Sequence, residues 1–273
     1  QIVRAGAEGG LDIRSKSSHN DLVTQVDTAS ERAIRETILA RHPDHSILGE
    51  EGGLAGASPY RWVVDPLDGT VNFARGLPHY CVSVGLEHGG QGLVGVVAEP
   101  LTGAVYRAGR GAGCFKDDRP ATVSGCRTVR DAYVSMSFSA GAALSDKAMA
   151  LWTALLGRAH TLRRLGSTAL ELAWVAEGRL DAFVGFGQGA WDLAAGGVLG
   201  VRGGAFVLGS CSGPVVFTLP FTLRRRSLFL SLAFWFIVPA GSPSEGRCPL
   251  GVDEASSPPF GCAPAVCCPG PNP

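Results

Sequence analysis

Residues 62–73 have the sequence WVVDPLDGTVNF, which carries the strongest structural signal in the chain. The apolar residues before Asp65 predict a buried strand that delivers this carboxylate to a strand end, because Pro66 has no N–H with which to continue the ladder. Asp68 follows three residues later, so we expect the two carboxylates to converge on one point. Mg²⁺ prefers oxygen ligands and takes only a few from protein, with water and substrate phosphate supplying the rest. The stretch therefore predicts a magnesium site at a strand end.

Gly69 and Thr70 open the turn after the two aspartates, where their N–H groups can hold phosphate oxygens. A turn with Asp at its corners and a helix cap would also explain this stretch, since Asp and Gly are common turn residues. Three further acids favour the metal site. They are Asp27 at the end of DLVTQVD, Glu50 in a glycine-flanked loop after a short strand, and Asp192 at the head of a small-residue helix.

Several pieces of the chain resemble the inositol monophosphatase family of metal-dependent, lithium-sensitive phosphatases. They occur in the family's order and with similar spacing: KSSHNDLVTQVD (16–27), GEE (49–51), WVVDPLDGTVNF (62–73), RRLGSTALELA (163–173) and WDLAAGG (191–197). The resemblance covers about residues 10–205. It implies an α+β and α/β chain folded as a layered αβαβα sandwich of the inositol monophosphatase type, followed by a tail unlike the family. It also implies a homodimer.

The resemblance further implies a site with two to three Mg²⁺ ions. Glu50, Asp65 and the backbone carbonyl of Leu67 would hold the first ion, and Asp65, Asp68 and Asp192 the second. Glu50 would also contact a weaker third ion through water.

The reaction implied by the resemblance is hydrolysis of a small phosphate monoester by in-line attack of water, without a covalent intermediate. One metal lowers the pKa of the water and another stabilises the leaving alkoxide. Glu50 and Thr70 would orient the water, and Asp27 would support Thr70. A phosphatase of the haloacid dehalogenase type, which forms an aspartyl phosphate, is an alternative. Its two aspartates lie two residues apart, whereas Asp65 and Asp68 lie three apart, and this spacing argues against it.

The substrate is less well defined by the sequence than the reaction is. The residues that the resemblance places around phosphate and the organic part are Gly69, Thr70, Gly166, Ser167, Thr168 and Asp192. Lys16 is most simply an ordinary solvated lysine, and a point charge for phosphate is the alternative. Many family members have an acid seven residues before the Trp-Asp aspartate, where it meets the inositol hydroxyls, but this chain has Gly185 there. Inositol monophosphate is favoured, and histidinol phosphate, fructose bisphosphate and adenosine 3′,5′-bisphosphate remain alternatives.

Composition excludes some classes of partner. The formal net charge is zero, so nothing suggests binding to a nucleic-acid polymer. The apolar run Leu228–Val238 is shorter than the roughly 20 residues of a membrane span, so we expect no membrane association. No signal-peptide pattern is visible, and Cys81, Cys114 and Cys126 are typical of buried thiols, so we expect a cytoplasmic protein.

The pattern of elements predicts two halves and a tail. Residues 1–140 form an α+β half with the main metal site, including a helix from about Thr28 whose capping box pairs Thr28 with Glu31. Antiparallel strands follow between about residues 80 and 107. Residues 141–208 form a partial α/β half, with helices at 145–160, at 168–177 and from Trp191.

Residues 209–273 change in character to Arg, Pro, Ser and Cys. We expect this tail to be disordered or aberrant, the product of a shifted reading frame or a retained intron. The strand and helix that complete the second half of the family fold would then be lost. An inactive product is therefore an alternative to an active phosphatase.

Overall fold

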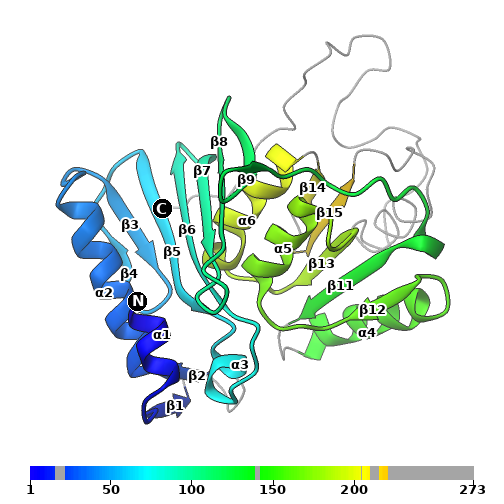
Figure 1. Cartoon of the computed structure of the whole chain (residues 1–273), viewed down its shortest axis with the longest axis horizontal. Coiled ribbons are helices and arrows are strands. Elements are labelled where there is room, and N and C mark those ends of the chain that lie inside the picture. The colour runs from blue at the N-terminus through cyan, green and yellow to red at the C-terminus, as the bar shows by residue number, and fades with distance from the viewer. Residues whose placement is uncertain (16–21, 139–141, 204, 210–214, 221–273) are drawn as a thin grey trace.

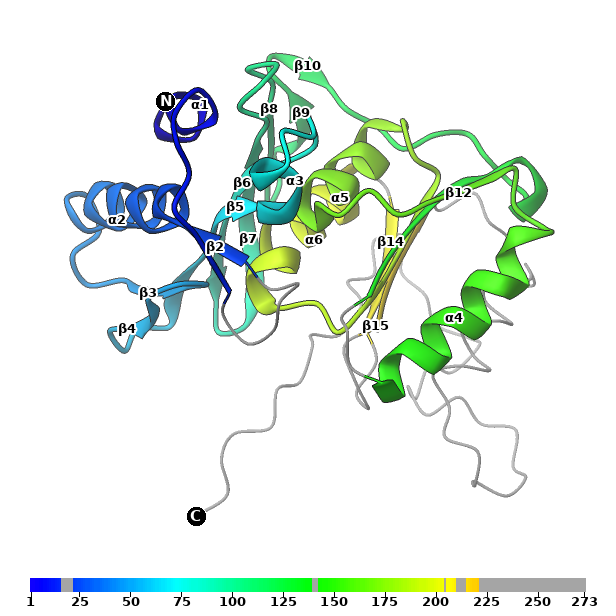
Figure 2. The ribbon, with the colours of Figure 1, turned by 90° about the horizontal axis from the view of Figure 1, so that it is seen from below.

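The computed structural model describes residues 1–15, 22–138, 142–203, 205–209 and 215–220. The helices are α1 (Ile2–Ala7), α2 (Gln25–Leu39), α3 (Thr70–Ala74), α4 (Ala142–Leu156), α5 (Thr168–Glu177) and α6 (Ala190–Gly203). They combine with two sheets in five layers, which Figure 2 shows edge-on: α1 and α2, the first sheet, α5 and α6, the second sheet, and α4. The predicted αβαβα sandwich is confirmed.

The first sheet has eight strands: β3 (Ser46–Gly49), β4 (Gly53–Ala55), β5 (Tyr60–Asp68), β6 (Cys81–His88), β7 (Gln91–Ala98), β8 (Val105–Gly109), β9 (Gly113–Lys116) and β10 (Arg119–Pro120). Their order is β10-β9-β8-β7-β6-β5-β3-β4 (Figure 1). Only β3 and β5 pair in parallel, and the other pairs are antiparallel, as predicted for the strands between residues 80 and 107.

The second sheet has five strands: β11 (Tyr133–Phe138), β12 (Thr161–Arg163), β13 (Ala182–Phe186), β14 (Ala205–Gly209) and β15 (Val215–Pro220). Their order is β12-β11-β13-β15-β14. β11 pairs in parallel with β12 and β13, while β15 is antiparallel to β13 and β14. A separate two-stranded ribbon, β1 (Ile13–Ser15) with β2 (Leu22–Thr24), precedes α2.

Apolar side chains fill the space between the layers. One core lies between α4 and the second sheet, and another between α5, α6 and the first sheet. Burying one large apolar side chain contributes about 1.5–3 kcal/mol. Fully buried examples are Met136, Leu151, Leu155 and Phe186 in the first of these cores, and Tyr106, Leu170 and Leu199 in the second.

Helix α6 lies directly on β6 and β7 because those strands carry glycine where the helix passes. A Cβ atom at Gly95 would lie 2.4 Å from the carbonyl oxygen of Ala195, and one at Gly85 would lie 2.8 Å from the Cβ of Ala194. The hydroxyl of Ser83 lies 3.4 Å from the carbonyl oxygen of Trp191, to which it donates. The first turn of α6, which includes Asp192, is thereby fixed against the first sheet.

The start of α2 differs from the prediction. The helix begins at Gln25, and its N-cap is Thr24, whose side chain accepts from Val26 N while the Asp27 carboxylate accepts from Thr24 N at 2.8 Å. The predicted capping box of Thr28 and Glu31 is wrong, because the chain turns from β2 into the helix four residues earlier. Glu31 consequently takes no part in capping the helix.

Pro66 was also expected to end its strand, and this is wrong, because β5 continues to Asp68. The pairing of β5 with β6 shifts between Asp65, which faces Ser83, and Asp68, which faces Cys81. Three steps on β5 thus match two on β6, which defines a bulge, where proline is tolerated. Alternate residues of a strand share a face, so the bulge brings Asp65 and Asp68 to the same side of the sheet.

The predicted division of the chain into residues 1–140, 141–208 and 209–273 stays a prediction. The strand pairing places the limits of the second sheet elsewhere. Strand β11 already belongs to the second sheet, and β15 extends that sheet beyond residue 208. Lys16 and residues 221–273, including the apolar run Leu228–Val238, lie outside the described residues. Among the described helices, none has the length and apolar character required to cross a membrane.

Candidate active site

Three aspartates meet on the inner side of the first sheet. Asp65 and Asp68 come from the bulged end of β5, and Asp192 comes from the first turn of α6. Each offers a carboxylate oxygen, and these three oxygens all lie within 4.8 Å of one another. Asp65 and Asp68 are buried, at 1% and 6% exposure. The arrangement brings together three of the residues that the sequence predicted as metal ligands.

Asp65 is the centre of this cluster electrostatically. Burial raises the pKa of Asp65 well above its usual range, and the negative charges of Asp68, Glu50 and Asp192 raise it further. A buried group of mutually repelling carboxylates is costly unless a positive charge compensates it. Carboxylate oxygens are also the ligands that Mg²⁺ prefers, so the residues present fit a divalent cation.

Asp68 is held from the opposite half of the molecule. Its carboxylate accepts from Ser167 Oγ at 2.7 Å, from Ala169 N at 2.7 Å and from Thr168 N at 3.1 Å. Cys81 Sγ lies 3.5 Å away and donates to the same carboxylate. Burial raises the pKa of Asp68 to about 6, and these hydrogen bonds keep it from rising further. The first amides of α5 are thus bound to a strand of the first sheet.

Glu50 lies in the loop that follows β3. Its N–H donates to the carbonyl of Val64 at 3.1 Å, which ties the loop to β5 just before Asp65. Its carboxylate is near enough to contribute to the raised pKa of Asp65. Glu50 is therefore adjacent to the cluster, although its oxygens do not belong to the group of three.

Thr70 begins α3 and links the cluster to α2. Its Oγ1 lies 3.0 Å from Asp27 Oδ1 and 2.9 Å from the carbonyl oxygen of Leu67, and its single proton can be donated to either. The N–H of Leu67 donates to Asp65 Oδ1 at 3.0 Å. Asp27 is completely buried. The structure therefore places Asp27, Thr70 and Leu67 in one chain of contacts that leads to Asp65.

Gly69 makes the turn between the aspartates and Thr70 possible. Its φ of 93° is in the left-handed region that favours glycine, and a Cβ here would lie 3.0 Å from the carbonyl oxygen of His79.

The loop Gly166–Ser167–Thr168 lies beside Asp68 at the start of α5. Thr168 Oγ1 donates to Gln188 Oε1 at 2.5 Å, and the N–H of Gly189 donates to Asp192 Oδ2 at 2.6 Å. The residues predicted to surround the organic part of the substrate therefore border the acidic cluster. Gly185, in place of an acid, lies in β13, where a Cβ would meet Gln188 Cγ at 2.8 Å.

Two buried glutamates that hold site loops were missed by the sequence reasoning. Glu171 accepts from the N–H groups of Gly166 at 3.0 Å and Ser167 at 3.1 Å, and from the hydroxyl of Ser135. Glu31 accepts from the N–H groups of the loop after Glu50. The contacts of Glu31 join segments about 20 residues apart, whereas Glu171 lies in the same motif, residues 163–173, as the two amides that it binds, and that motif could have drawn attention to it.

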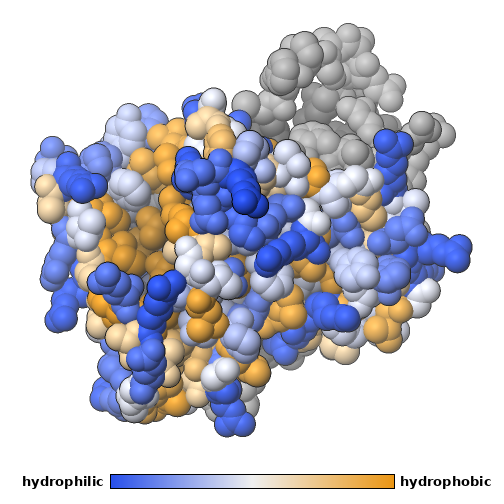
Figure 3. All heavy atoms as spheres, viewed as in Figure 1, coloured by the Kyte–Doolittle hydropathy of each residue, from blue (hydrophilic) through white to orange (hydrophobic). Residues whose placement is uncertain are grey.

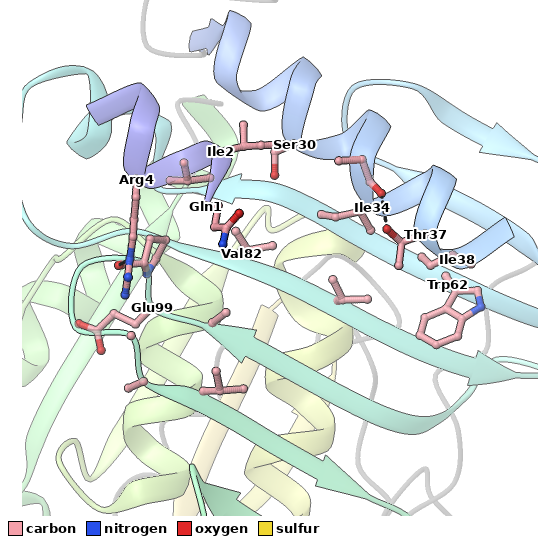
Figure 4. A pocket seen from close by; sticks show the side chains of 18 of the residues that line it. Gln1, Ile2, Arg4, Ser30, Ile34, Thr37, Ile38, Trp62, Val82 and Glu99 are labelled. Atoms are coloured by element: carbon pink, nitrogen blue, oxygen red, sulfur yellow. Dashed lines mark hydrogen bonds between the residues drawn. The ribbon is translucent and has the colours of Figure 1, made fainter. Parts of the chain in front are cut away.

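A pocket of about 760 Å³ lies elsewhere, on the outer face of the first sheet. Figure 4 shows it between α1, α2 and the strands, with Ile34, Ile38, Trp62 and Val82 among its lining. Figure 3 shows hydrophobic surface over the same region. None of the predicted site residues lines this pocket, so it is separate from the acidic cluster.

The chain is similar to known proteins over most of its length. A family model described as the inositol monophosphatase family matches residues 1–230. The chain belongs to the inositol monophosphatase family. Among curated family members, inositol-1-monophosphatase SuhB of Mycobacterium tuberculosis is 40% identical over 217 residues, which cover 76% of this chain and 74% of that protein. Nus factor SuhB of Xylella fastidiosa is 39% identical over 193 residues, 70% of each chain.

Solved structures of the family have the same fold. Extragenic suppressor protein SuhB of Bartonella henselae superimposes with a TM-score of 0.79 at 28% identity, over 86% of this chain and 92% of its own. The IMPase of Thermotoga maritima superimposes with a TM-score of 0.76 at 26% identity, over the same shares of the two chains. The family resemblance stated from the sequence motifs is thereby confirmed.

Proposed function

We propose that this inositol monophosphatase family member hydrolyses a small phosphate monoester in a Mg²⁺-dependent reaction. The observation that carries the proposal is the group of Asp65, Asp68 and Asp192, the first two buried and the third half-buried, whose carboxylate oxygens all lie within 4.8 Å of one another. The names of the curated relatives, several of which are inositol-1-monophosphatases, support the same reaction class.

The metal would be held by Asp65, Asp68 and Asp192, with Glu50 and the carbonyl of Leu67 completing a set for two to three ions. When bound, Mg²⁺ would activate water and neutralise developing charge on phosphate and leaving group.

The chain's own residues would orient the reactants. The Thr70 hydroxyl oxygen can accept a hydrogen bond from the attacking water while the hydroxyl donates to Asp27, and the Glu50 carboxylate can accept a hydrogen bond from the other hydrogen of that water. The N–H groups of Gly69 and Thr70 would bind phosphate oxygens. Gly166, Ser167 and Thr168 would border the organic part.

Inositol monophosphate is the substrate that we favour, because relatives at 40% identity carry that activity in their names. Gly185 in place of an acid makes the hydroxyl-binding side of the site less polar, so the other small phosphates named above belong in the same test. Cytoplasmic location and a homodimer are further parts of the proposal and rest on the sequence patterns and the resemblance. An inactive product is the competing hypothesis.

The test is phosphate release from inositol 1-phosphate, histidinol phosphate, fructose 1,6-bisphosphate and adenosine 3′,5′-bisphosphate, with Mg²⁺ and with EDTA. We expect activity only with Mg²⁺ and a loss of at least about 10²-fold in Asp65→Asn, because a shared metal ligand is removed. Asp44→Asn, at an exposed position in the turn before β3, is the matched control and should retain activity. Activity that is the same in EDTA would contradict the metal mechanism, and trapping of a phosphoenzyme would revive the aspartyl-phosphate alternative.

A further inference from the structure

Glu31 is a buried acid that takes no part in the metal cluster or in capping its own helix. It lies on α2 with 3% of its surface exposed. Its Oε2 accepts from the N–H of Glu51 at 2.8 Å, and its Oε1 accepts from the N–H of Gly52 at 2.9 Å. Arg35 Nε donates to Oε1 at 2.7 Å from the next turn of the helix. Both oxygens are therefore occupied, and the two amides that they bind follow Glu50 directly.

The loop is shaped to receive this carboxylate. A Cβ at Gly49 would lie 2.4 Å from the carboxyl carbon of Glu31, and a Cβ at Gly52 would lie 2.6 Å from Glu31 Oε1. Glycine at both positions lets the backbone on either side of Glu50 contact the carboxylate closely. Arg35 Nη2 donates to the carbonyl of Gly53 at 2.6 Å, so the contacts between α2 and this loop extend to the start of β4.

Glu50 is thus held on two sides. Its own N–H donates to Val64 on β5, one residue before Asp65. The next two N–H groups donate to Glu31 on α2. This arrangement fixes the backbone at Glu50 between the sheet and the outer helix layer, while the charge of Glu50 acts on Asp65.

We propose that Glu31 is a positioning residue, which holds the Glu50 loop so that the Glu50 carboxylate reaches the metal site. This inference rests on the proposed function. It differs from a purely structural role, in which the pair Glu31–Arg35 only stabilises α2 as an i, i+4 ion pair. The two hydrogen bonds to the loop favour the positioning role, because an ion pair within the helix does not require them.

The test compares Glu31→Gln with Glu36→Gln, which makes the same chemical change at an exposed position of the same helix. Glutamine has one acceptor oxygen for the two loop amides and no charge for Arg35. We expect faster hydrogen–deuterium exchange in a peptide covering residues 49–53, and Mg²⁺ affinity by titration calorimetry that is weaker by about 10- to 100-fold. At saturating Mg²⁺, the KM for substrate should change less than about twofold, because Glu31 does not border the substrate, while kcat falls. Glu36→Gln should resemble the wild type in all of these.

A second variant approaches the same contact from the loop. Gly52→Ala places a methyl group against Glu31 Oε1 and leaves α2 unchanged, so it serves if Glu31→Gln does not fold. The inference is overturned if either folded variant binds Mg²⁺ as tightly as the wild type, even when exchange of residues 49–53 is faster. It is also overturned if the wild type itself binds no Mg²⁺. A wild type that binds Mg²⁺ but releases no phosphate would refute the proposed function alone, and weaker Mg²⁺ binding by the variants would then still support the role of Glu31.

Discussion

Single side chains in this protein act on the site from a distance by binding backbone N–H groups. Glu171 illustrates this at the second sheet. It is completely buried, and its Oε1 binds the amides of Gly166 and Ser167, while Ser167 in turn donates to Asp68. Burial raises the pKa of Glu171 to about 7, so near neutral pH a substantial fraction of it carries a proton. A neutral side chain of the same shape should therefore be tolerated.

We predict that Glu171→Gln and Glu171→Ala differ strongly. Glutamine keeps an oxygen for the two amides and can direct its NH₂ group to the oxygen of Ser135, so the free energy of unfolding should fall by less than about 1 kcal/mol. Alanine leaves the buried N–H of Ser167 without its partner, while the N–H of Gly166, an exposed residue, can bind water instead, so the loss should be about 1–3 kcal/mol. Urea unfolding of the two variants measures this. Equal losses would show that the charge, rather than the acceptor oxygen, is what the loop requires.

At the scale of elements, helix α2 has two candidate N-cap residues. Thr24 caps the helix in the structure, whereas the sequence pattern favoured Thr28. Both are threonines with an acid three residues later, Asp27 and Glu31, so local pattern cannot separate them. The ribbon of β1 and β2 separates them, because it delivers the chain in an extended conformation as far as Thr24.

We predict that Thr24→Ala lowers the free energy of unfolding by about 1 kcal/mol, because the helix loses its cap. Thr28→Ala, inside the helix, should change it by less than about 0.5 kcal/mol. Thermal or urea unfolding of the two variants side by side is sufficient. The reverse order would mean that α2 begins at the later threonine.

Elements that the sequence predicted well are those with a local signal. Helix α5 has the bounds that were expected, residues 168–177, and the aspartates of residues 62–73 meet as their spacing suggested. The bulge at Pro66 was not predictable in the same way, because it exists only in the pairing of β5 with β6. Glu31 contacts Glu51 across 20 residues, so no motif contains both partners. Glu171 lies in the same motif as Gly166 and Ser167, and only its contact with Ser135 is distant, across 36 residues. Strand β15 lies beyond the last motif recognised in the sequence, although the family model extends to residue 230.

For the whole molecule, the metal site lies where the first sheet meets the middle helix layer. Asp65 and Asp68 belong to the sheet, and Asp192 belongs to α6. Burial raises the pKa of Asp68 to about 6 and that of Asp65 well above its usual range. The folded protein therefore binds protons at these sites more tightly than the unfolded chain, whose aspartates titrate near pH 3.8. The stabilising contribution of Asp68 is complete below about pH 4 and is lost as pH rises through about 6, and that of Asp65 is also lost as pH rises.

We predict that the free energy of unfolding of the metal-free protein falls as pH rises from about 4 through about 6, and that saturating Mg²⁺ removes this fall by stabilising the ionised carboxylates. His79, whose pKa burial lowers to about 4, opposes part of the trend below about pH 6.5, because it must stay neutral in the folded protein. Urea unfolding at several pH values, in EDTA and in Mg²⁺, gives the comparison. The prediction would be contradicted if the free energy of unfolding changed with pH in the same way in EDTA and in Mg²⁺.

Asp27 uses its two carboxylate oxygens for different purposes: Oδ2 binds Thr24 at the start of α2, and Oδ1 faces Thr70 beside the cluster. This one residue therefore contributes both to the start of a helix and to the orientation of a hydroxyl in the site. Natural selection on either property acts on the other, and an amide at this position offers an acceptor to only one of them. Directed evolution of a new activity that begins at Thr70 would consequently have to find its stability elsewhere, since position 27 cannot be optimised for the two tasks separately.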